Sequence, residues 1–301
     1  MPHAPTNILR GMALVASAVR VFADMDATTK HLATAWNVPL VVALRYIGNL
    51  FLLVAIFGPR EGRALVATQR TGLALVRATS LAMASRFAGL AFQRMPVAET
   101  TAIIFLAPFG VMILGAALVD EKIALSNWAA AVAGFLGVLL IVRPGSGLDP
   151  WGVTFALLTA AATVSYNLLS RVLARTETTP ALMFYSALAG TIVFGATLPW
   201  SWRDAVPGPL DLTLFAGIGA MALAGHFRFT AADRHAPASA LAPVNYLHLG
   251  WAGLLGWLVF QHVPDRRSLL GMALVAGSGV AAALYAHLST RRSGALAPNG
   301  A

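Results

Sequence analysis

The sequence contains no cysteine and little charge. Only 11% of its 301 residues are Asp, Glu, Lys or Arg, whereas an ordinary soluble domain carries about a quarter. Without Cys the chain forms no disulfide and offers no thiolate nucleophile or thiolate metal ligand. Lysine is scarce too, because 19 of the 21 basic residues are Arg. They lie scattered between apolar runs, so the net charge of +9 makes no basic patch that would bind nucleic acid.

Apolar runs dominate what remains. Hydrophobic residues make up 58% of the chain, too much for a soluble protein of this size, so we expect the solvent to be lipid. A membrane helix needs about 20 largely apolar residues. Runs of that kind, separated by short segments rich in Pro, Gly or charge, predict ten helices near residues 8–28, 39–58, 72–92, 97–119, 126–142, 150–170, 181–200, 211–231, 238–260 and 268–288. The segments between them are too short to hold a soluble domain.

The second half of the chain echoes the first at a constant offset of 141 residues. This offset pairs Pro96 with Pro237 and Gly115 with Gly256. The same register also pairs Gly11 with Gly152, Lys30 with Arg171 and Pro39 with Pro180. We therefore expect a duplicated protein, with a first repeat at residues 8–145, a second at residues 149–288 and a cytoplasmic tail at residues 289–301.

Five helices per repeat is an odd number, so the second copy would enter the membrane upside down. Many secondary transporters have this inverted-repeat architecture. With both chain ends in the cytoplasm, ten basic residues lie in cytoplasmic segments, six lie on the other side and five lie within helices, a bias that favours this orientation. The expected fold is an all-α integral membrane protein with ten transmembrane helices in two inverted five-helix repeats.

Several segments resemble the EamA domain of the drug/metabolite transporter superfamily. They are MPVAETTAIIFLAPF (95–109), LVDEKI (118–123) and GFLGVLLIVRPG (134–145) in the first repeat, and HAPASALAPVNYL (235–247) and GWLVFQHVPDRRSLLGMALVAGSG (256–279) in the second. Arg45-Tyr46 also resembles the family pattern. The acidic residue that precedes the last helix of a repeat is kept as Glu121, but Gln261-His262 replaces it in the second copy.

The resemblance implies a central cavity and alternating-access transport of small organic solutes, without a cofactor. In length and general character the chain is similar to bacterial aromatic amino acid exporters. In this family the last helix of each repeat supports packing or a homodimer. Glycines that permit close helix approach recur in both of these helices, at Gly134, Gly137, Gly271, Gly277 and Gly279.

Charged residues within apolar helices are costly, so each is a candidate for the site. Arg20 and Asp24 are four residues apart on one helix face, with Asp26 close by. They either form a pair that only neutralises charge, or Asp24 or Asp26 lines the cavity and meets an ammonium group or a proton. The offset places Tyr166 opposite Met25 and Asn167 opposite Asp26, which favours a shared polar cavity.

Arg45, which precedes Tyr46, either snorkels to the surface or anchors a carboxylate, that of the substrate or of Glu99. Arg86 poses the same choice, whereas Arg77 lies nearer a helix end and is expected to snorkel. Glu99 lies in the first turn of its helix, where it either complements the helix dipole or binds a proton or the substrate.

The later helices add further candidates. Pro108 predicts a kink or hinge. His226, Asn245, Tyr246 and His248 interrupt two apolar runs. Either His could move protons or be a structural hydrogen-bonding residue, and the tyrosine could form an aromatic wall of the cavity or an interfacial belt.

These observations predict a secondary transporter in the bacterial inner membrane, with the lipid bilayer and a small-molecule substrate as partners. The chain has no HExxH-type pair, no GxSxG and no Cys, so we expect neither an enzyme nor a metal site. Paired acidic and basic groups near aromatic rings suit export of an amino acid with an aromatic or hydrophobic side chain. Export of organic cations or drugs, and import of a vitamin-like metabolite, stay open as alternatives.

Overall fold

The computed structural model describes residues 7–118, 125–143, 145–174, 176–202, 206–232, 235–236 and 238–295. Regular secondary structure in these ranges is helical throughout. The helices are α1 (Ile8–Ala35), α2 (Val38–Glu61), the short 3-10 helix η1 (Gly62–Leu65), α3 (Thr71–Arg94), α4 (Val97–Ile104), α5 (Ala107–Leu118), α6 (Leu125–Val142), α7 (Pro150–Leu173), α8 (Thr179–Gly195), α9 (Leu198–Ser201), α10 (Pro209–Ala232), α11 (Ala238–Asn245), α12 (Leu247–Phe260) and α13 (Arg266–Ala295). Each predicted run coincides with one helix or with two consecutive helices. Glu121 lies outside the described residues.

Polar side chains at the helix starts explain several of these boundaries. Oδ1 of Asn7 accepts a hydrogen bond from a first-turn N–H of α1. Asp149 does the same for α7, where it accepts bonds from the backbone N–H groups of Trp151 and Gly152. These bonds, that of Gly152 foremost, hold the pKa of Asp149 below its ordinary value. The start of each half of the chain is thus fixed by a capping residue.

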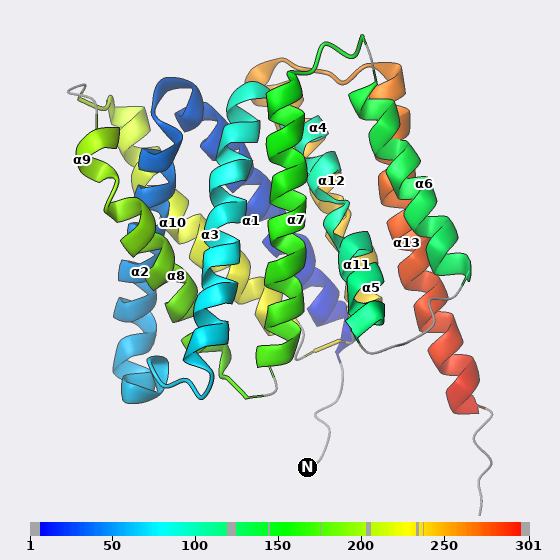
Figure 1. The fold of residues 1–301 in the computed structure, drawn as a ribbon, viewed down its shortest axis with the longest axis horizontal. Coiled ribbons are helices and arrows are strands. Elements are labelled where there is room, and N and C mark those ends of the chain that lie inside the picture. Colours follow the sequence, from blue (N-terminus) through cyan, green and yellow to red (C-terminus); the bar gives the residue numbers. More distant parts are fainter. Residues whose placement is uncertain are drawn as a thin grey trace, which may run out of the picture.

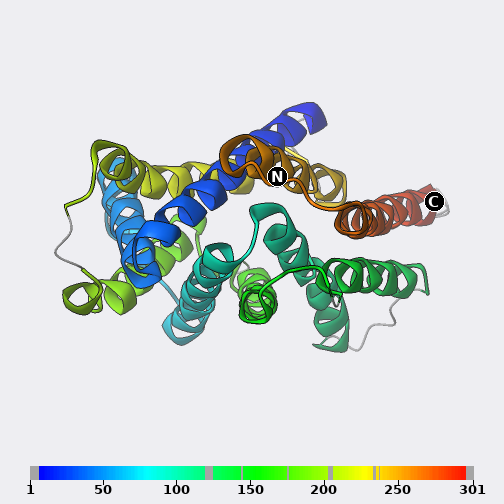
Figure 2. The same cartoon turned by 90° about the horizontal axis from the view of Figure 1, so that it is seen from above.

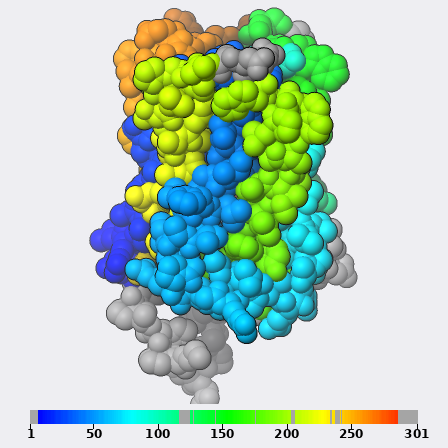
Figure 3. All heavy atoms as spheres, turned by 90° about the vertical axis from the view of Figure 1, so that its left-hand side faces the viewer, coloured from blue at the N-terminus to red at the C-terminus, as the bar shows by residue number. Residues whose placement is uncertain are grey.

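The helices form one bundle, which α1 crosses obliquely (Figures 1 and 2). Helices α6 and α13 stand side by side at one edge, and α2, α8 and α10 form the opposite edge, where α2 lies between the other two (Figure 3). The start of α1 and the end of α13 lie at the same end of the bundle (Figure 1). We call this the terminal end, and the opposite end, where α4 begins and α12 ends, the distal end.

Helix boundaries repeat at the 141-residue offset seen in the sequence. Val38 and Thr179 begin α2 and α8, and Leu125 and Arg266 begin α6 and α13. Corresponding helices run in opposite directions: α1 runs from the terminal end to the distal end, and α7 runs back (Figure 1).

Three of the predicted runs contain two helices each: 181–200 ends in the four-residue α9, and 97–119 and 238–260 are divided near the middle. The break between α4 and α5 begins at Phe105, and the break between α11 and α12 falls at Tyr246, which are again 141 residues apart. At both breaks the backbone is bonded at i→i+3 spacing, through the N–H groups of Leu106 and Tyr246. Pro108 follows the first break, where its missing N–H leaves the carbonyl of Ile104 without a helical donor.

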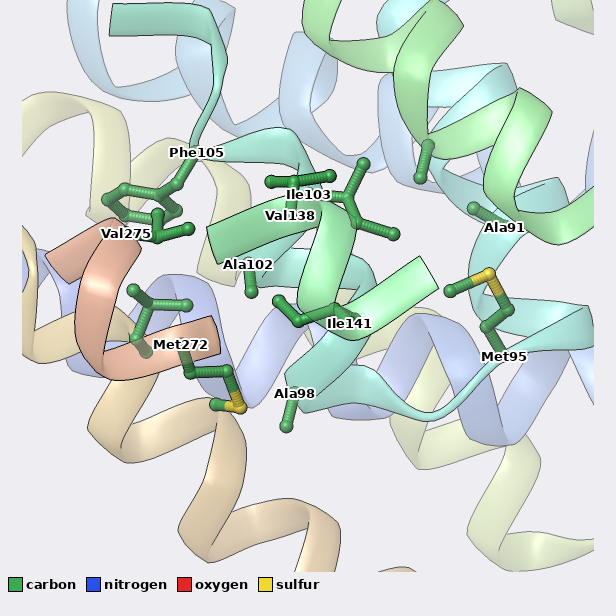
Figure 4. Packing of buried hydrophobic residues seen from close by; sticks show 12 residues of the cluster. Ala91, Met95, Ala98, Ala102, Ile103, Phe105, Val138, Ile141, Met272 and Val275 are labelled. Carbon is green, nitrogen blue, oxygen red and sulfur yellow. The ribbon is translucent and has the colours of Figure 1, made fainter. Parts of the chain in front are cut away.

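Close helix crossings depend on glycine. A Cβ on Gly219 of α10 would lie 2.7 Å from the backbone nitrogen of Asn49 in α2, and a Cβ on Gly137 of α6 would lie 2.6 Å from the carbonyl oxygen of Gly271 in α13. The glycines of α6 and α13, the last helices of the two repeats, were predicted to permit close helix approach. In the structure these two helices pack closely against each other. Figure 4 shows the adjoining core, where Ile141 and Met272 pack beside α4.

The outer surface of the bundle is apolar. Among the residues that the structure describes, five segments are long and apolar enough to cross a membrane: Val38–Leu65, Val97–Gly115, Pro150–Leu173, Pro209–Ala232 and Arg266–Tyr285. Large exposed side chains such as Phe51, Phe135 and Ile192 would face lipid chains. An apolar groove of about 410 Å³ lies on this surface between α2 and α8, lined by Ile47, Leu50, Phe51, Val54, Ala55 and Thr191. Membrane insertion accounts for this exposed apolar area.

Candidate functional site

After its first turn, helix α1 carries four charged side chains, Arg20, Asp24, Asp26 and Lys30. It packs against α10, α11, α12 and α3, so its polar face meets other helices rather than lipid. Asp26 lies in its middle, and Nε2 of His248 in α12 approaches Oδ2 of Asp26 to 3.1 Å. Both side chains are mostly buried. A carboxylate and an imidazole from opposite halves of the chain thus meet within the bundle.

Aromatic rings surround this Asp26–His248 pair. Phe22, one turn before Asp26, lies 5.1 Å from the ring of His226 and 6.5 Å from that of His248, measured between ring centroids. From the other side Phe105 lies 5.8 Å from His248 and 5.1 Å from the ring of Tyr246. Phe105 and Tyr246 are the residues at the two helix breaks. We call this group of rings, with Asp26, the aromatic cluster.

The predicted pair of Arg20 and Asp24 is present next to the aromatic cluster. Nε of Arg20 donates to Oδ1 and Oδ2 of Asp24 at 3.1 and 3.0 Å. The guanidinium also lies over the ring of Trp251, 4.4 Å from its centroid. Both charged side chains are partly exposed, so the pair can also face a polar solute.

Arg45 does not pair with Glu99. No described carboxylate lies within 4.0 Å of its guanidinium, which instead lies over the ring of Tyr46 at 5.0 Å. Tyr46 is buried, shares a hydrogen bond of 2.8 Å with Ser85 of α3 and stacks on Phe194. The prediction that Arg45 anchors Glu99 is therefore wrong, whereas anchoring of a substrate carboxylate stays a prediction.

Glu99 has another partner. Nε2 of His262, in the segment after α12, lies 3.0 Å from its Oε1. Lys30 of α1 lies at the same end of the bundle and donates to the carbonyls of Phe92 and Met95 at 2.9 and 2.7 Å. Glu99 thus pairs with an imidazole at the very position where the sequence departs from the family's acidic residue.

Arg77 is buried rather than snorkelling, which corrects the expectation for this residue. Its side chain donates to Ser170 Oγ at 2.7 Å, to Ser186 Oγ at 2.8 Å, to Tyr166 Oη at 2.8 Å and to the carbonyl of Leu182 at 3.0 Å. These partners lie in α7 and α8, so one guanidinium joins three helices. Tyr166, a predicted cavity residue, serves this network and also lies under the guanidinium at 4.4 Å.

Three other predicted residues make no side-chain hydrogen bond or ion pair among the described residues: Arg86, Asn167 and Asn245. Arg86 is exposed and lies nine residues from Arg77, which places the two on opposite faces of α3. Asn245 is the last residue of α11 and adjoins the break at Tyr246. Among the described side chains no group of three His, Asp or Glu residues could hold a metal ion.

Sequence reasoning missed the roles of Phe22, Phe105, Arg77 and His262. Phe105 could have been found, because its partner at the 141-residue offset is the singled-out Tyr246. The remaining three depend on which helix faces which, and a single sequence does not contain that information.

We compared the chain with known protein families, curated proteins and solved structures. Residues 9–143 and 150–283 each match the EamA-like transporter family. The chain is 26% identical to the pseudopaline exporter CntI of Pseudomonas aeruginosa over 270 residues, 88% of this chain and 93% of that protein. It is 28% identical to a riboflavin transporter of Rhizobium johnstonii over 275 residues, 90% of each chain, and 24% identical to an S-adenosylmethionine uptake transporter of Rickettsia felis over 253 residues, 83% of this chain and 84% of that one.

A crystal structure of a protein 18% identical in sequence shares the fold with a TM-score of 0.65, over 94% of this chain and 99% of that chain. The names of these relatives concern pseudopaline, riboflavin and S-adenosylmethionine, so the narrower resemblance to aromatic amino acid exporters stays a prediction. The two family matches together span most of the chain. The chain therefore belongs to the EamA-like transporter family of the drug/metabolite transporter superfamily and is a multi-pass membrane transporter of small metabolites.

Proposed function

We propose that this protein is a secondary transporter that moves a small metabolite with an aromatic ring and an ammonium group across the bacterial cytoplasmic membrane. Transport would occur by alternating access and without covalent chemistry. The best candidates are aromatic or hydrophobic amino acids, with export as the expected direction.

The architecture we infer is ten membrane crossings in two inverted five-helix repeats. The matching helix starts, the matching breaks at Phe105 and Tyr246 and the opposite directions of α1 and α7 support it. Ten crossings would put both termini on one side of the membrane, and the basic-residue bias favours the cytoplasm. A homodimer through α6 and α13 stays a prediction of the family resemblance.

The aromatic cluster carries the proposal for the substrate. It places the carboxylate of Asp26 against the imidazole of His248, whose ring lies near those of Phe22 and Phe105. Phe105 in turn lies near Tyr246, and these two residues mark the helix breaks. A carboxylate among aromatic faces attracts a cation through charge and through the ring quadrupoles. A flat apolar ring of the solute would stack on the same side chains.

Arg45 distinguishes a zwitterion from a simple cation. Because it lacks a carboxylate partner among the described residues, it is available to a substrate carboxylate. An organic cation would need Asp26 but not Arg45, and an amino acid would need both. A vitamin-like metabolite is the second candidate, because flavin and adenine rings are planar and relatives are named for riboflavin and S-adenosylmethionine.

The test is uptake into proteoliposomes of labelled tryptophan, riboflavin and an organic cation such as tetraphenylphosphonium, beside protein-free vesicles. We expect protein-dependent tryptophan flux that falls at least tenfold in Asp26→Asn and in Arg45→Gln. Asp211→Asn is the matched control, because Asp211 also contacts a histidine, His31, at 3.4 Å, but lies at the start of α10. Flux of the cation alone, unaffected by Arg45→Gln, would refute the amino-acid assignment, and flux of riboflavin alone would support the second candidate.

A further inference from the structure

We propose that Glu99 and His262 together form a proton-binding site whose separation opens the distal end of the bundle. Opening of this end would then depend on the pH of the solution that it faces. This inference rests on the proposed transport function and adds a pH-dependent gate and the residues that form it.

Glu99 is placed where a bare charge is costly. Every residue from Val97 to Ile103 in α4 is buried, and the Glu99 side chain is only 3% exposed. Its Oε1 meets Nε2 of His262, whereas Oε2 is buried and has no hydrogen-bond partner among the described residues. A buried carboxylate with one bonded oxygen needs a compensating positive charge or a proton.

Lys30 does not supply that charge directly. Two of the three donors on its ammonium go to the carbonyls of Phe92 and Met95. No distance from Nζ of Lys30 to a carboxylate oxygen of Glu99 is within 4.0 Å, so the two opposite charges attract each other only over a longer distance. The remaining charged groups around α4 belong to pairs or lie at the start of α13: Arg94 with Asp149, Arg143 with Asp265, and Arg266 and Arg267. A proton shared with His262 is therefore the compensation that the geometry leaves.

His262 connects this proton to water. Its side chain is 37% exposed, against 3% for Glu99, so the imidazole spans from the buried carboxylate to the surface of the distal end. An imidazole changes its protonation near neutral pH when it is free in water. The pair thus has both a reason to hold a proton when closed and a route to release it.

Within the described part of the chain, the Glu99–His262 pair is one of four charged contacts that join the two halves at the distal end. The other three are Arg94–Asp149, His31–Asp211 and Arg143–Asp265. Opening this end for alternating access requires α4 to move away from the segment after α12. The pair cannot then survive, because its two members lie on the two sides of that movement.

The proton balance of this step is simple. In the closed state the pair holds one proton between carboxylate and imidazole. When the two groups separate, Glu99 becomes a hydrated carboxylate, His262 a neutral imidazole, and the proton passes to water at the distal end. Closing takes one proton back from the same solution, so the step moves no net proton across the membrane. An acidic solution at the distal end therefore favours the closed state.

The opening can be measured without a substrate. Because the chain has no Cys, two cysteines can be introduced for spin labels at Trp151 and Val263, whose side chains are exposed at the distal end. By pulsed electron paramagnetic resonance we expect the label–label distances to lengthen as the pH rises from about 6 to about 8.5. Glu99→Gln should abolish this response, and His31→Gln, which removes the other histidine pair at this end, should keep it. A distance distribution that ignores pH, or a response that survives in Glu99→Gln, would overturn the proposal.

The gate is then tested in proteoliposomes with labelled tryptophan, riboflavin and tetraphenylphosphonium as probes, at equal pH on both sides. We expect protein-dependent flux to slow as the pH is lowered from about 8.5 to about 6. Glu99→Gln and His262→Gln should lose this pH dependence. An equal pH dependence in these variants would overturn the proton site and leave the transport function standing. A pH response in the spin-label experiment without flux of any probe would support the proton site and refute the proposed substrates.

Discussion

Replacement of Arg77 by Met should destabilise the protein far more than the same change at Arg86. Arg77 is 6% exposed and donates four hydrogen bonds to α7 and α8. Two of its acceptors are oriented in advance. The hydroxyl groups of Ser170 and Ser186 each donate a hydrogen bond to the backbone carbonyl one turn earlier, at 2.7 and 2.9 Å, which leaves an oxygen lone pair for Arg77. Arg86 lies exposed on the opposite face of α3 and makes no described hydrogen bond.

The loss can be worked out from these four bonds. Hydrogen bonds between membrane helices contribute about 0.6 kcal/mol on average and about 1.7 at most. Because the donor is charged, we take a value above the average, about 0.75–1 kcal/mol for each bond. Four of them amount to about 3–4 kcal/mol, since Met fills the volume of the Arg stem but supplies no donor. For a chain of this size that corresponds to a melting temperature lower by about 6–16 °C.

Thermal unfolding in detergent, followed by circular dichroism, measures this difference. We expect Arg86→Met to change the free energy of unfolding by no more than about 0.5 kcal/mol. The reasoning is refuted if Arg77→Met melts within about 2 °C of the wild type, or if the two variants melt together. In the first case the network would be replaced by water, and in the second the cost would come from loss of charge alone.

Three further outcomes follow from the same contacts. Gly137→Leu should lower the melting temperature by about 2–10 °C, which corresponds to about 1–3 kcal/mol, because a Cβ there would lie 2.6 Å from the carbonyl of Gly271; Gly250→Leu, where a Cβ meets nothing within 4 Å, is the control. Tyr46→Phe should cost about 1 kcal/mol in chemical unfolding, since it removes the bond to Ser85. The backbone N–H of Ser268, followed by Arg143, lowers the pKa of Asp265 to about 2. Because the folded-state pKa is lowered, the ionised carboxylate stabilises the folded state at any pH above the unfolded-state pKa near 4, and this stabilisation is lost as the pH falls toward 2. Asp265→Asn should therefore lower the melting temperature equally at pH 6 and pH 8.

Much of the fold could be predicted from the sequence because lipid imposes a length on every apolar run. The predicted starts and ends fall within a few residues of the helices for runs such as 126–142 and 211–231, where Pro, Gly or charge ends the run. The division of runs 97–119 and 238–260 was less visible, because i→i+3 bonds satisfy the backbone at each break without a polar side chain. Pro108 signalled the first break, and nothing comparable follows Tyr246.

Contacts within a helix could be predicted, and contacts between helices could not. The i,i+4 spacing of Arg20 and Asp24 fixes their proximity whatever the helix packs against. Asp26 meets His248 only because α1 crosses the bundle obliquely, and that tilt arises from packing of the whole chain. Arg77 was expected at the surface from its distance to a helix end, but three hydroxyl groups on other helices decide its position.

The change of the acidic residue before the last helix can be understood as the exchange of a carboxylate for an imidazole that pairs with Glu99. His262 occupies the position 141 residues after Glu121, and it gives the buried Glu99 a base as partner. His262→Glu would place two carboxylates together, which must share a proton or separate. We therefore expect His262→Glu to lengthen the distance between labels at Trp151 and Val263 at neutral pH, and Glu99→His combined with His262→Glu to restore it. If the single and double variants give the same distances, the pair is not what holds the distal end closed.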